Sequence, residues 1–245
     1  MRIGTAELES SEAASRRLRE TPPRRRLSAK AAARKLVLSA FGAKERLAAE
    51  AGLLLTFDDG PDPDVTPAVL DLLARYDAKA VFFIVGNRIP RAPQMLSRIL
   101  KEGHWIGNHT FRHPLGGTPS FIEYYRDVKN CQAVIESHIG QRPSLFRPPL
   151  GSLTFASLLA PRLAGLQTML WSVDVDDWKL RRDDDAVRAG NRLAELAAPG
   201  DIVLLHDDNS CVVPLLETAL PKLCDRQLDV TNALSRVVQL KRCYE

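Results

Sequence analysis

The chain has 245 residues, of which 45% are hydrophobic and 26% are charged, which is enough for a barrel-sized domain and excludes a chain that is disordered throughout. Its net charge of +4 is uneven: residues 1–50 hold 12 Lys and Arg against 6 Asp and Glu, so the remaining 195 residues carry −2. The globular part therefore has no basic excess, and we expect no nucleic-acid partner.

The cysteines and the apolar runs exclude two further classes of protein. The four cysteines show no close metal-ligand or disulfide-framework spacing, and we expect free thiols at Cys131, Cys211, Cys224 and Cys243. No apolar run approaches the roughly 18 residues of a membrane span, so no transmembrane segment is expected. Since no signal peptide is recognisable, a cytoplasmic location is expected, with export left open if the N-terminus is incomplete.

In chain order, the first predicted feature is a basic N-terminal extension over residues 1–50. Residues 1–26 are rich in Arg, Glu, Ser and Pro and are predicted to be disordered. Residues 28–50 combine helix formers with spaced apolar positions, which predicts an amphipathic helix. We interpret the extension as a solvated tail, with a basic arm for an acidic surface as the alternative, and predict a separate domain over 51–245.

From residue 51 onward, short apolar runs alternate with segments of helical periodicity. The apolar runs predict strands at 53–57, 80–85, 105–107, 145–146, 168–173 and 202–205. Helices are predicted at 66–76, 92–102, 120–139, 152–163, 184–196 and 211–226. This alternation indicates parallel strands joined by crossover helices, and six or seven such units favour a closed or nearly closed barrel over an open sheet.

Polar clusters directly follow five of the apolar runs. They begin at Asp58, His109, Arg147, Asp174 and His206. Because the carboxyl ends of parallel strands meet at one edge of the sheet, we expect these clusters to converge on a single site.

The first cluster is the adjacent carboxylate pair Asp58-Asp59, which precedes Gly60. Neighbouring carboxylates repel each other, so their surroundings tend to push their pKa values apart. A metal ion relieves that repulsion when it takes one carboxylate as a ligand, and the other is then free to act as a base. We assign Asp59 as a metal ligand and Asp58 as the general base. The alternative for Asp58 is an ordinary turn cap before Gly60.

The second cluster holds His109 and His113, which are four residues apart. On a helical turn this spacing would place both rings on one side, where they can share a metal ion. With Asp59 they form a His2Asp set with open positions, which suits zinc or another divalent ion such as cobalt. Taken alone, the histidine pair is weak evidence, because such pairs are more often surface or core histidines than metal ligands.

The remaining clusters supply partners for this centre. Arg147 can hold a carboxylate ionised and oriented, or can form a surface ion pair. His206 follows a buried run and is a natural general acid for a leaving amine. Asp177 can orient His206 and keep it protonated.

Five segments, in chain order, resemble the motifs of the NodB-homology polysaccharide deacetylases, carbohydrate esterase family 4. They are Thr56-Phe57-Asp58-Asp59-Gly60-Pro61, His109-Thr110-Phe111-Arg112-His113, Arg147-Pro148-Pro149-Leu150-Gly151, Asp177-Trp178 and Leu204-Leu205-His206. Their order and approximate spacing match over residues 53–207. The resemblance implies a distorted (β/α)7 barrel and metal-dependent removal of N-acetyl groups from N-acetylglucosamine residues.

The resemblance also implies a role for each matched residue. Metal binding falls to Asp59, His109 and His113. The base is Asp58, tuned by Arg147, and the acid is His206, tuned by Asp177. A main-chain N–H, that of Leu150, is expected to hold the oxyanion.

Three residues bear on the substrate pocket. Leu150 stands where the third motif commonly has an aromatic residue, so the pocket wall is expected to differ there. Trp178 and Leu204 are expected to line an acetyl pocket, with plain core residues as the alternative. Residues 228–238 match the family less well and could supply a final strand or a closing helix.

These observations predict a metal-dependent hydrolase that removes N-acetyl groups from N-acetylglucosamine-containing glycans, of chitooligosaccharide type. Peptidoglycan or polymeric chitin is the second choice, because it requires export. Two alternatives stay open: hydrolysis of another amide, such as a formamido sugar, and a catalytically silent carbohydrate-binding protein. The predicted partner is an N-acetylated oligo- or polysaccharide, and the cofactor is a divalent metal ion, zinc before cobalt.

Overall fold

The computed structural model describes residues 29–114 and 119–235. The chain divides into two units, Met1–Val37 and Leu38–Glu245, and the sheet and site described below belong to the second. The elements, in chain order, are α2 (Ala29–Ala40), η1 (Ala49–Ala51), β1 (Leu54–Asp58), α3 (Val65–Arg75), β2 (Ala80–Ile84), η2 (Gly86–Arg91), α4 (Gln94–Lys101), β3 (Trp105–Asn108), α5 (Phe121–Ile139), β4 (Leu145–Phe146), η3 (Pro149–Gly151), α6 (Phe155–Leu163), β5 (Gln167–Thr168), β6 (Val173–Asp174), η4 (Asp177–Lys179), α7 (Asp183–Leu196), β7 (Ile202–His206) and α8 (Val212–Asp225).

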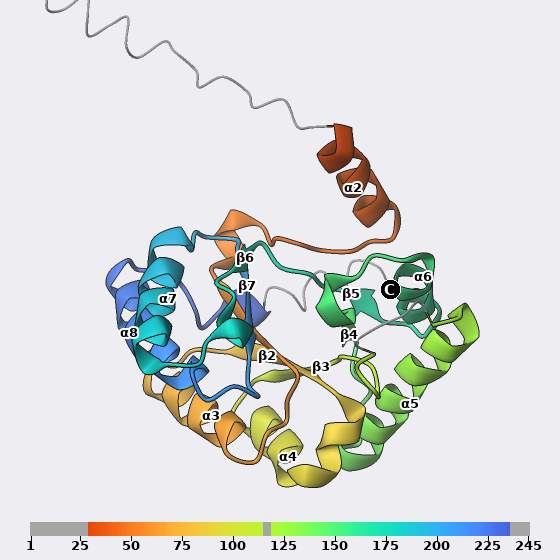
Figure 1. Cartoon of the computed structure of the whole chain (residues 1–245), viewed down its shortest axis with the longest axis horizontal. Coiled ribbons are helices and arrows are strands. Elements are labelled where there is room, and N and C mark those ends of the chain that lie inside the picture. Colours follow the sequence, from red (N-terminus) through yellow and green to blue (C-terminus); the bar gives the residue numbers. More distant parts are fainter. Residues whose placement is uncertain (1–28, 115–118, 236–245) are drawn as a thin grey trace, which may run out of the picture. The chain divides into compact units, whose positions relative to one another are not determined.

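The seven strands form one parallel sheet in the order β5-β4-β3-β2-β1-β7-β6. The sheet curls into a half-barrel, and α7, α8, α3, α4, α5 and α6 follow its outer side from one end to the other (Figure 1). Strand β1 lies at the centre between β2 and β7, with Leu55 opposite Ala80 on one side and Val203 on the other. Neighbours that are distant in sequence are therefore side by side at the centre of the sheet.

The central strands are apolar on both faces, which explains their continuous hydrophobic runs. Leu55 and Phe57 of β1 are fully buried in the cluster that packs against the helices. Leu54, which points the other way, is fully buried in a second cluster on the inner side of the sheet. None of the helices in the described residues is both long and apolar enough to cross a membrane.

Capping residues set the start of the helices that follow two site loops. The Ser120 side chain accepts from the main-chain N–H of Glu123, and the Glu123 side chain accepts from the main-chain N–H of Ser120. These two hydrogen bonds form a capping box before α5. Thr154 and Ser157 form the same arrangement before α6. Helices α5 and α6 therefore each begin at a defined residue.

The run 168–173, predicted as one strand, is two short strands, β5 and β6, with a break between them. At the break, the carbonyl oxygens of Met169 and Leu170 accept hydrogen bonds from the Arg147 guanidinium, at 3.1 and 3.0 Å. Because these two carbonyls accept from the buried Arg147 guanidinium, the run does not continue as one strand. The sheet is open between β5 and β6.

The helix predicted over 28–50 ends at Ala40, and Gly42 has a left-handed φ of 67°. Residues 44–47 instead bond to the sheet. The N–H of Lys44 donates to Thr168 at 3.0 Å, and the N–H of Leu47 donates to Gly200 at 2.8 Å. This segment therefore links the region beside β5 to the start of β7.

The C-terminal segment also contacts the sheet. The N–H of Leu53 donates to Asp229 at 2.7 Å, and the N–H of Lys79 donates to Val230 at 2.9 Å. Residues 233–235 are helical, and the rest of the element predicted over 228–238 lies outside the described residues.

The described cysteines are free thiols, as expected. Cys131 and Cys211 are buried and Cys224 is exposed, while Cys243 lies outside the described residues.

Candidate active site

The predicted site residues gather at the carboxyl ends of the strands. Eight of the ten line one pocket of about 500 Å³, and the other two, Arg147 and Asp177, lie behind it with no exposed surface. The pocket is lined by Asp58, Asp59, His109, His113, Leu150, Trp171, Asp174, Asp176, Trp178, Leu204 and His206. In the pairing of β1 with β7, Asp58 is directly opposite His206.

The three predicted metal ligands face one another. His113 Nε2 lies 3.1 Å from Asp59 Oδ1, and His109 Nε2 lies 3.5 Å from the same oxygen. Ligand atoms about 2.05 Å from a tetrahedral zinc ion are about 3.3 Å apart, so both distances fit one ion. Within the described part of the chain, these residues form the one group of three or more His, Cys, Asp or Glu side chains that could hold a metal ion.

The ring of His109 has a defined tautomer. Its Nδ1 lies 2.8 Å from the carbonyl oxygen of Arg147, which can only accept, so Nδ1 carries the proton. Burial lowers the pKa of His109 to about 3, even though the charge of Asp59 acts to raise it. His109 is therefore neutral, and its Nε2 presents a lone pair toward Asp59, as metal-ligating histidines do.

The two histidines do not share a helical turn, so that part of the prediction is wrong. Thr110 and His113 have left-handed φ values of 66° and 51°. The loop is held by side chains: Asp127 accepts from the N–H groups of Phe111 and Arg112 at 3.0 and 3.2 Å. The rings are nevertheless 5.0 Å apart, because this loop also folds them to one side.

Asp59 itself has the features of a ligand. Its Oδ1 is buried and makes no hydrogen bond to any residue that the structure describes. A buried acceptor without a partner is costly, and a metal ion held with His109 and His113 would satisfy it. The donor set and the orphaned oxygen together fit a divalent cation.

Asp58 is held by a buried arginine. Arg147 Nη1 donates to Asp58 Oδ1 at 2.9 Å and to Thr56 Oγ1 at 2.7 Å. The guanidinium also lies over the Phe83 ring, 4.3 Å from its centroid. With its remaining donors on Met169 and Leu170, Arg147 is fixed, and the expected contact with the predicted base is present.

Burial governs the charge of this pair. It raises the pKa of Asp58, and the charges of Arg147 and His206 oppose that rise. A carboxylate with a raised pKa is a stronger base than an exposed aspartate. The second oxygen, Asp58 Oδ2, lies 3.7 Å from His109 Nε2, on the side where the ligands converge.

His206 is oriented by Asp177. The two carboxylate oxygens of Asp177 contact the Nδ1 of His206 at 2.8 Å and accept from its main-chain N–H at 2.7 Å. Burial lowers the pKa of His206, but the hydrogen bond and charge of Asp177 outweigh it and raise the pKa to about 9. His206 is therefore protonated at neutral pH, with Nε2 left to reach the pocket.

The apolar part of the pocket wall consists of Leu150, Trp171, Trp178 and Leu204. Leu150 and Trp178 are 69% and 51% exposed, so they stand at the rim, while Leu204 is buried at 4%. The sequence prediction missed Trp171, which lies in the run interpreted as a strand. Its indole packs against Gly151, where a Cβ would come within 2.6 Å of the ring.

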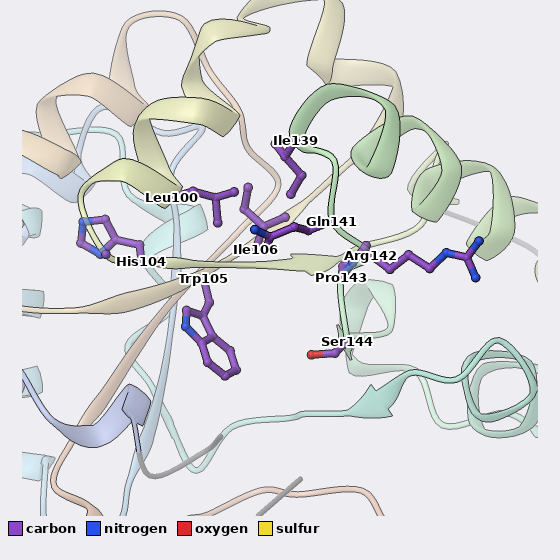
Figure 2. Close-up of a pocket in the computed structure, with 10 residues that line it drawn as sticks. Leu100, His104, Trp105, Ile106, Ile139, Gln141, Arg142, Pro143 and Ser144 are labelled. Atoms are coloured by element: carbon purple, nitrogen blue, oxygen red, sulfur yellow. The ribbon is translucent and has the colours of Figure 1, made fainter. Parts of the chain in front are cut away.

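A second pocket, of about 360 Å³, lies around the start of β3 (Figure 2). In Figure 2, Trp105 and Ile106 point to opposite sides of the strand. His104 accepts from the N–H of Ala80 at 3.2 Å, and burial lowers its pKa to about 4. None of the ten predicted site residues lines this pocket, so the candidate chemistry stays at the other end of the strands.

Known proteins share these features. A family model described as polysaccharide deacetylase matches residues 48–169, which include Asp58, the three candidate metal ligands and Arg147. A peptidoglycan-N-acetylglucosamine deacetylase of Bacillus cereus is 42% identical over 176 residues, which cover 70% of this chain and 81% of that protein. The chain belongs to the polysaccharide deacetylase family.

The chain is also similar to a chitooligosaccharide deacetylase of Azorhizobium caulinodans, with 36% identity over 160 residues, covering 64% of this chain and 74% of that one. A crystal structure of a peptidoglycan N-acetylglucosamine deacetylase, in complex with 4-naphthalen-1-yl-N-oxidanyl-benzamide, has a TM-score of 0.71 at 30% identity and covers 78% of this chain and 90% of that one. The predicted distorted (β/α)7 fold is confirmed.

A further crystal structure, of a carbohydrate esterase family 4 pseudoenzyme from Bacillus anthracis, has a TM-score of 0.69 at 26% identity and covers 76% of this chain and 65% of that one. The polysaccharide deacetylase fold is thus shared by a protein described as a pseudoenzyme. Activity must therefore be argued from the side chains of the site.

Proposed function

We propose that the protein is a metal-dependent N-deacetylase that removes acetyl groups from N-acetylglucosamine residues of a glycan. One observation carries the proposal: the ligand group Asp59, His109 and His113 lines the same pocket as a base held by arginine and an acid held by aspartate. This arrangement supplies both proton transfers that hydrolysis of an amide requires.

Divalent metal bound at this group supplies Lewis acidity toward the acetamide carbonyl and the attacking water. Asp58 accepts the proton of that water through Oδ2, because Oδ1 is engaged by Arg147. The main-chain N–H of Leu150, at the rim of the pocket, is the proposed donor to the developing oxyanion. His206 gives the proton on Nε2 to the leaving nitrogen, so that acetate and a free amino sugar result.

The walls of the pocket support a sugar substrate. Leu150 and Trp178 present apolar faces at the rim, where a pyranose ring can pack, and Trp171 and Leu204 bound the inner wall, where a methyl group can be buried. We propose chitooligosaccharides as the first substrate class, since they present N-acetylglucosamine without peptide. Peptidoglycan, named for the Bacillus cereus relative, is the second.

Acetate release with defined metals tests the proposal. The metal-free protein is incubated with chitooligosaccharides and with peptidoglycan fragments, and acetate is measured before and after addition of zinc or cobalt. We expect release only with metal. Release that survives exhaustive chelation would contradict the metal assignment.

The same assay separates the two alternatives. Release of formate from a formamido sugar, without release of acetate, would change the proposed substrate class but leave the proposed mechanism intact. Glycan binding without release of either acid, under any metal, would identify a silent binding protein and refute the proposed activity.

A further inference from the structure

We propose that the segment after β2, residues 85–88, braces the two loops that carry the metal ligands, and that Arg88 is its positioning side chain. The inference rests on the proposed metal site and assigns a role to residues outside the motifs. Arg88 touches neither the predicted ligand atoms nor the proposed reacting groups, so it acts through Asp59.

Main-chain bonds from this segment reach both loops. The N–H of Val85 donates to the carbonyl of Gly60 at 2.9 Å, next to Asp59. The N–H groups of Gly86 and Asn87 donate to Thr110 and Phe111 at 3.0 and 2.9 Å, between the two histidines. The segment therefore ties the Asp59 loop and the histidine loop to one rigid support.

Close packing accompanies these bonds. A Cβ on Gly86 would lie 2.5 Å from the Phe111 ring and 3.2 Å from the Phe111 Cα, so only glycine lets the segment approach the histidine loop so closely.

Arg88 adds a side-chain link to Asp59. Its Nη1 donates to the main-chain carbonyl of Asp59 at 2.7 Å and to Asp208 Oδ2 at 2.7 Å. Asp208 follows β7 and lies two residues after His206, the proposed acid. Arg88 thus joins the loop of the metal ligand to the loop of the acid.

The hydrogen bond from Arg88 holds Asp59, a residue with a strained backbone and a carboxylate oxygen that is unpaired among the described residues. Asp59 has a left-handed φ of 75°, which costs energy for a residue with a side chain. Its Oδ1 is buried without a hydrogen bond in the described chain. Holding the carbonyl fixes this backbone, and the backbone in turn fixes the direction of the carboxylate toward the histidines.

If Arg88 acts only through its charge, removing it has the opposite effect on zinc affinity from the effect expected if it positions Asp59. A cation near a divalent ion repels it, so loss of the charge alone would tighten metal binding. If Arg88 positions Asp59, its loss frees the strained backbone and weakens binding. The sign of the change in zinc affinity therefore decides between the two.

The experiment measures zinc dissociation constants of the full chain by competition with a chromophoric chelator, and records the absorption spectrum with cobalt. Arg88→Ala is expected to weaken zinc binding about 10- to 100-fold, the usual effect of removing a support behind a ligand. Arg88→Gln, which keeps N–H donors without the charge, is expected to restore part of the affinity. Arg91→Ala is the matched control: Arg91 lies in the same short helix, η2, but outside residues 85–88, is 59% exposed at its side chain, and pairs with Asp62 at 3.8 Å.

Each outcome decides the inference. Weaker binding in Arg88→Ala, an altered cobalt spectrum and an unchanged Arg91→Ala support it. Equal or tighter binding in Arg88→Ala overturns it, and if that variant does not fold, equal or tighter binding in Arg88→Met, which keeps the length of the side chain but no N–H donor, does so. A wild-type chain that binds no zinc overturns the proposed metal site together with this inference, whereas failure of the inference alone leaves wild-type binding intact.

Discussion

Replacing Asp177 with asparagine is expected to move the basic limb of the pH profile of kcat/KM to lower pH. Asp177 accepts from the ring Nδ1–H and from the main-chain N–H of His206, and with it the pKa of His206 is raised from 6.5 to about 9. Asparagine keeps one acceptor and removes the charge. In the variant, burial still lowers the pKa of His206 while the charges of Asp58 and Asp59 still raise it, so we expect a pKa near the ordinary value of 6.5.

The size of the effect follows from the two values. A shift from about 9 to 6.5 corresponds to about 3 kcal/mol of interaction with the protonated ring. At pH 8 the protonated fraction falls from ~90% to ~3%, a loss of about 30-fold, whereas at pH 6 the fractions differ by less than about twofold. Bound metal offsets the charge of Asp59, so the wild-type limb lies at or below about 9.

The assay is acetate release from a chitooligosaccharide by the metal-loaded enzyme between pH 5.5 and 10, with kcat/KM reporting the free enzyme. Asp184→Asn, which removes the same charge at an exposed position at the start of α7, is the control and is expected to match the wild type. A basic limb at the same pH in wild type and Asp177→Asn would refute the assignment of His206 as the acid raised by Asp177.

Three further predictions follow from the same contacts. Asp58→Asn is expected to keep zinc affinity within about threefold but to lose at least about 100-fold in kcat, because it removes the base and not a ligand; full turnover would refute the base assignment. Arg147→Met leaves the fully buried carboxylate of Asp58 without its cation, and urea unfolding is expected to show a loss of about 3–5 kcal/mol; a loss below about 1 kcal/mol would contradict the buried pair. Deleting residues 1–37 is expected to leave acetate release unchanged, whereas deleting 1–50 is expected to abolish it, because 44–47 bond to the sheet; equal activity of the two truncations would show that this segment is dispensable.

The cytoplasmic location stays a prediction, as do the roles of the individual site residues. The assignment to the family rests on firmer ground, since it follows from the match over residues 48–169 and from a relative that is 42% identical.

The local sequence determined most of the elements. The apolar runs after residue 51 became strands, except for the break within 168–173, because residues buried on both faces of a parallel sheet must be apolar. The polar residues at the ends of the runs became the site, because the carboxyl ends of parallel strands meet at one edge of the sheet. Asp58 and Asp59, at the end of β1, could be assigned on this basis alone.

Only the tertiary structure decided which of these ends meet. Strand β1 pairs with β7, so Asp58 is opposite His206 although 148 positions separate them in the chain, and no local pattern records that pairing. Only the tertiary structure also explains the break between β5 and β6, where carbonyls distant in sequence accept from Arg147. It likewise explains the histidine loop, in which left-handed residues, and not a helical turn, bring the two rings to one side.

The support behind the ligands likewise depended on tertiary structure. The contact of Arg88 with a main-chain carbonyl, and of Trp171 with a glycine, leave no side-chain pattern in the sequence. Residue types and their periodicity report whether a position is buried. The identity of its neighbours is decided by the packing of the whole sheet, because each strand end must find partners for its own buried polar groups.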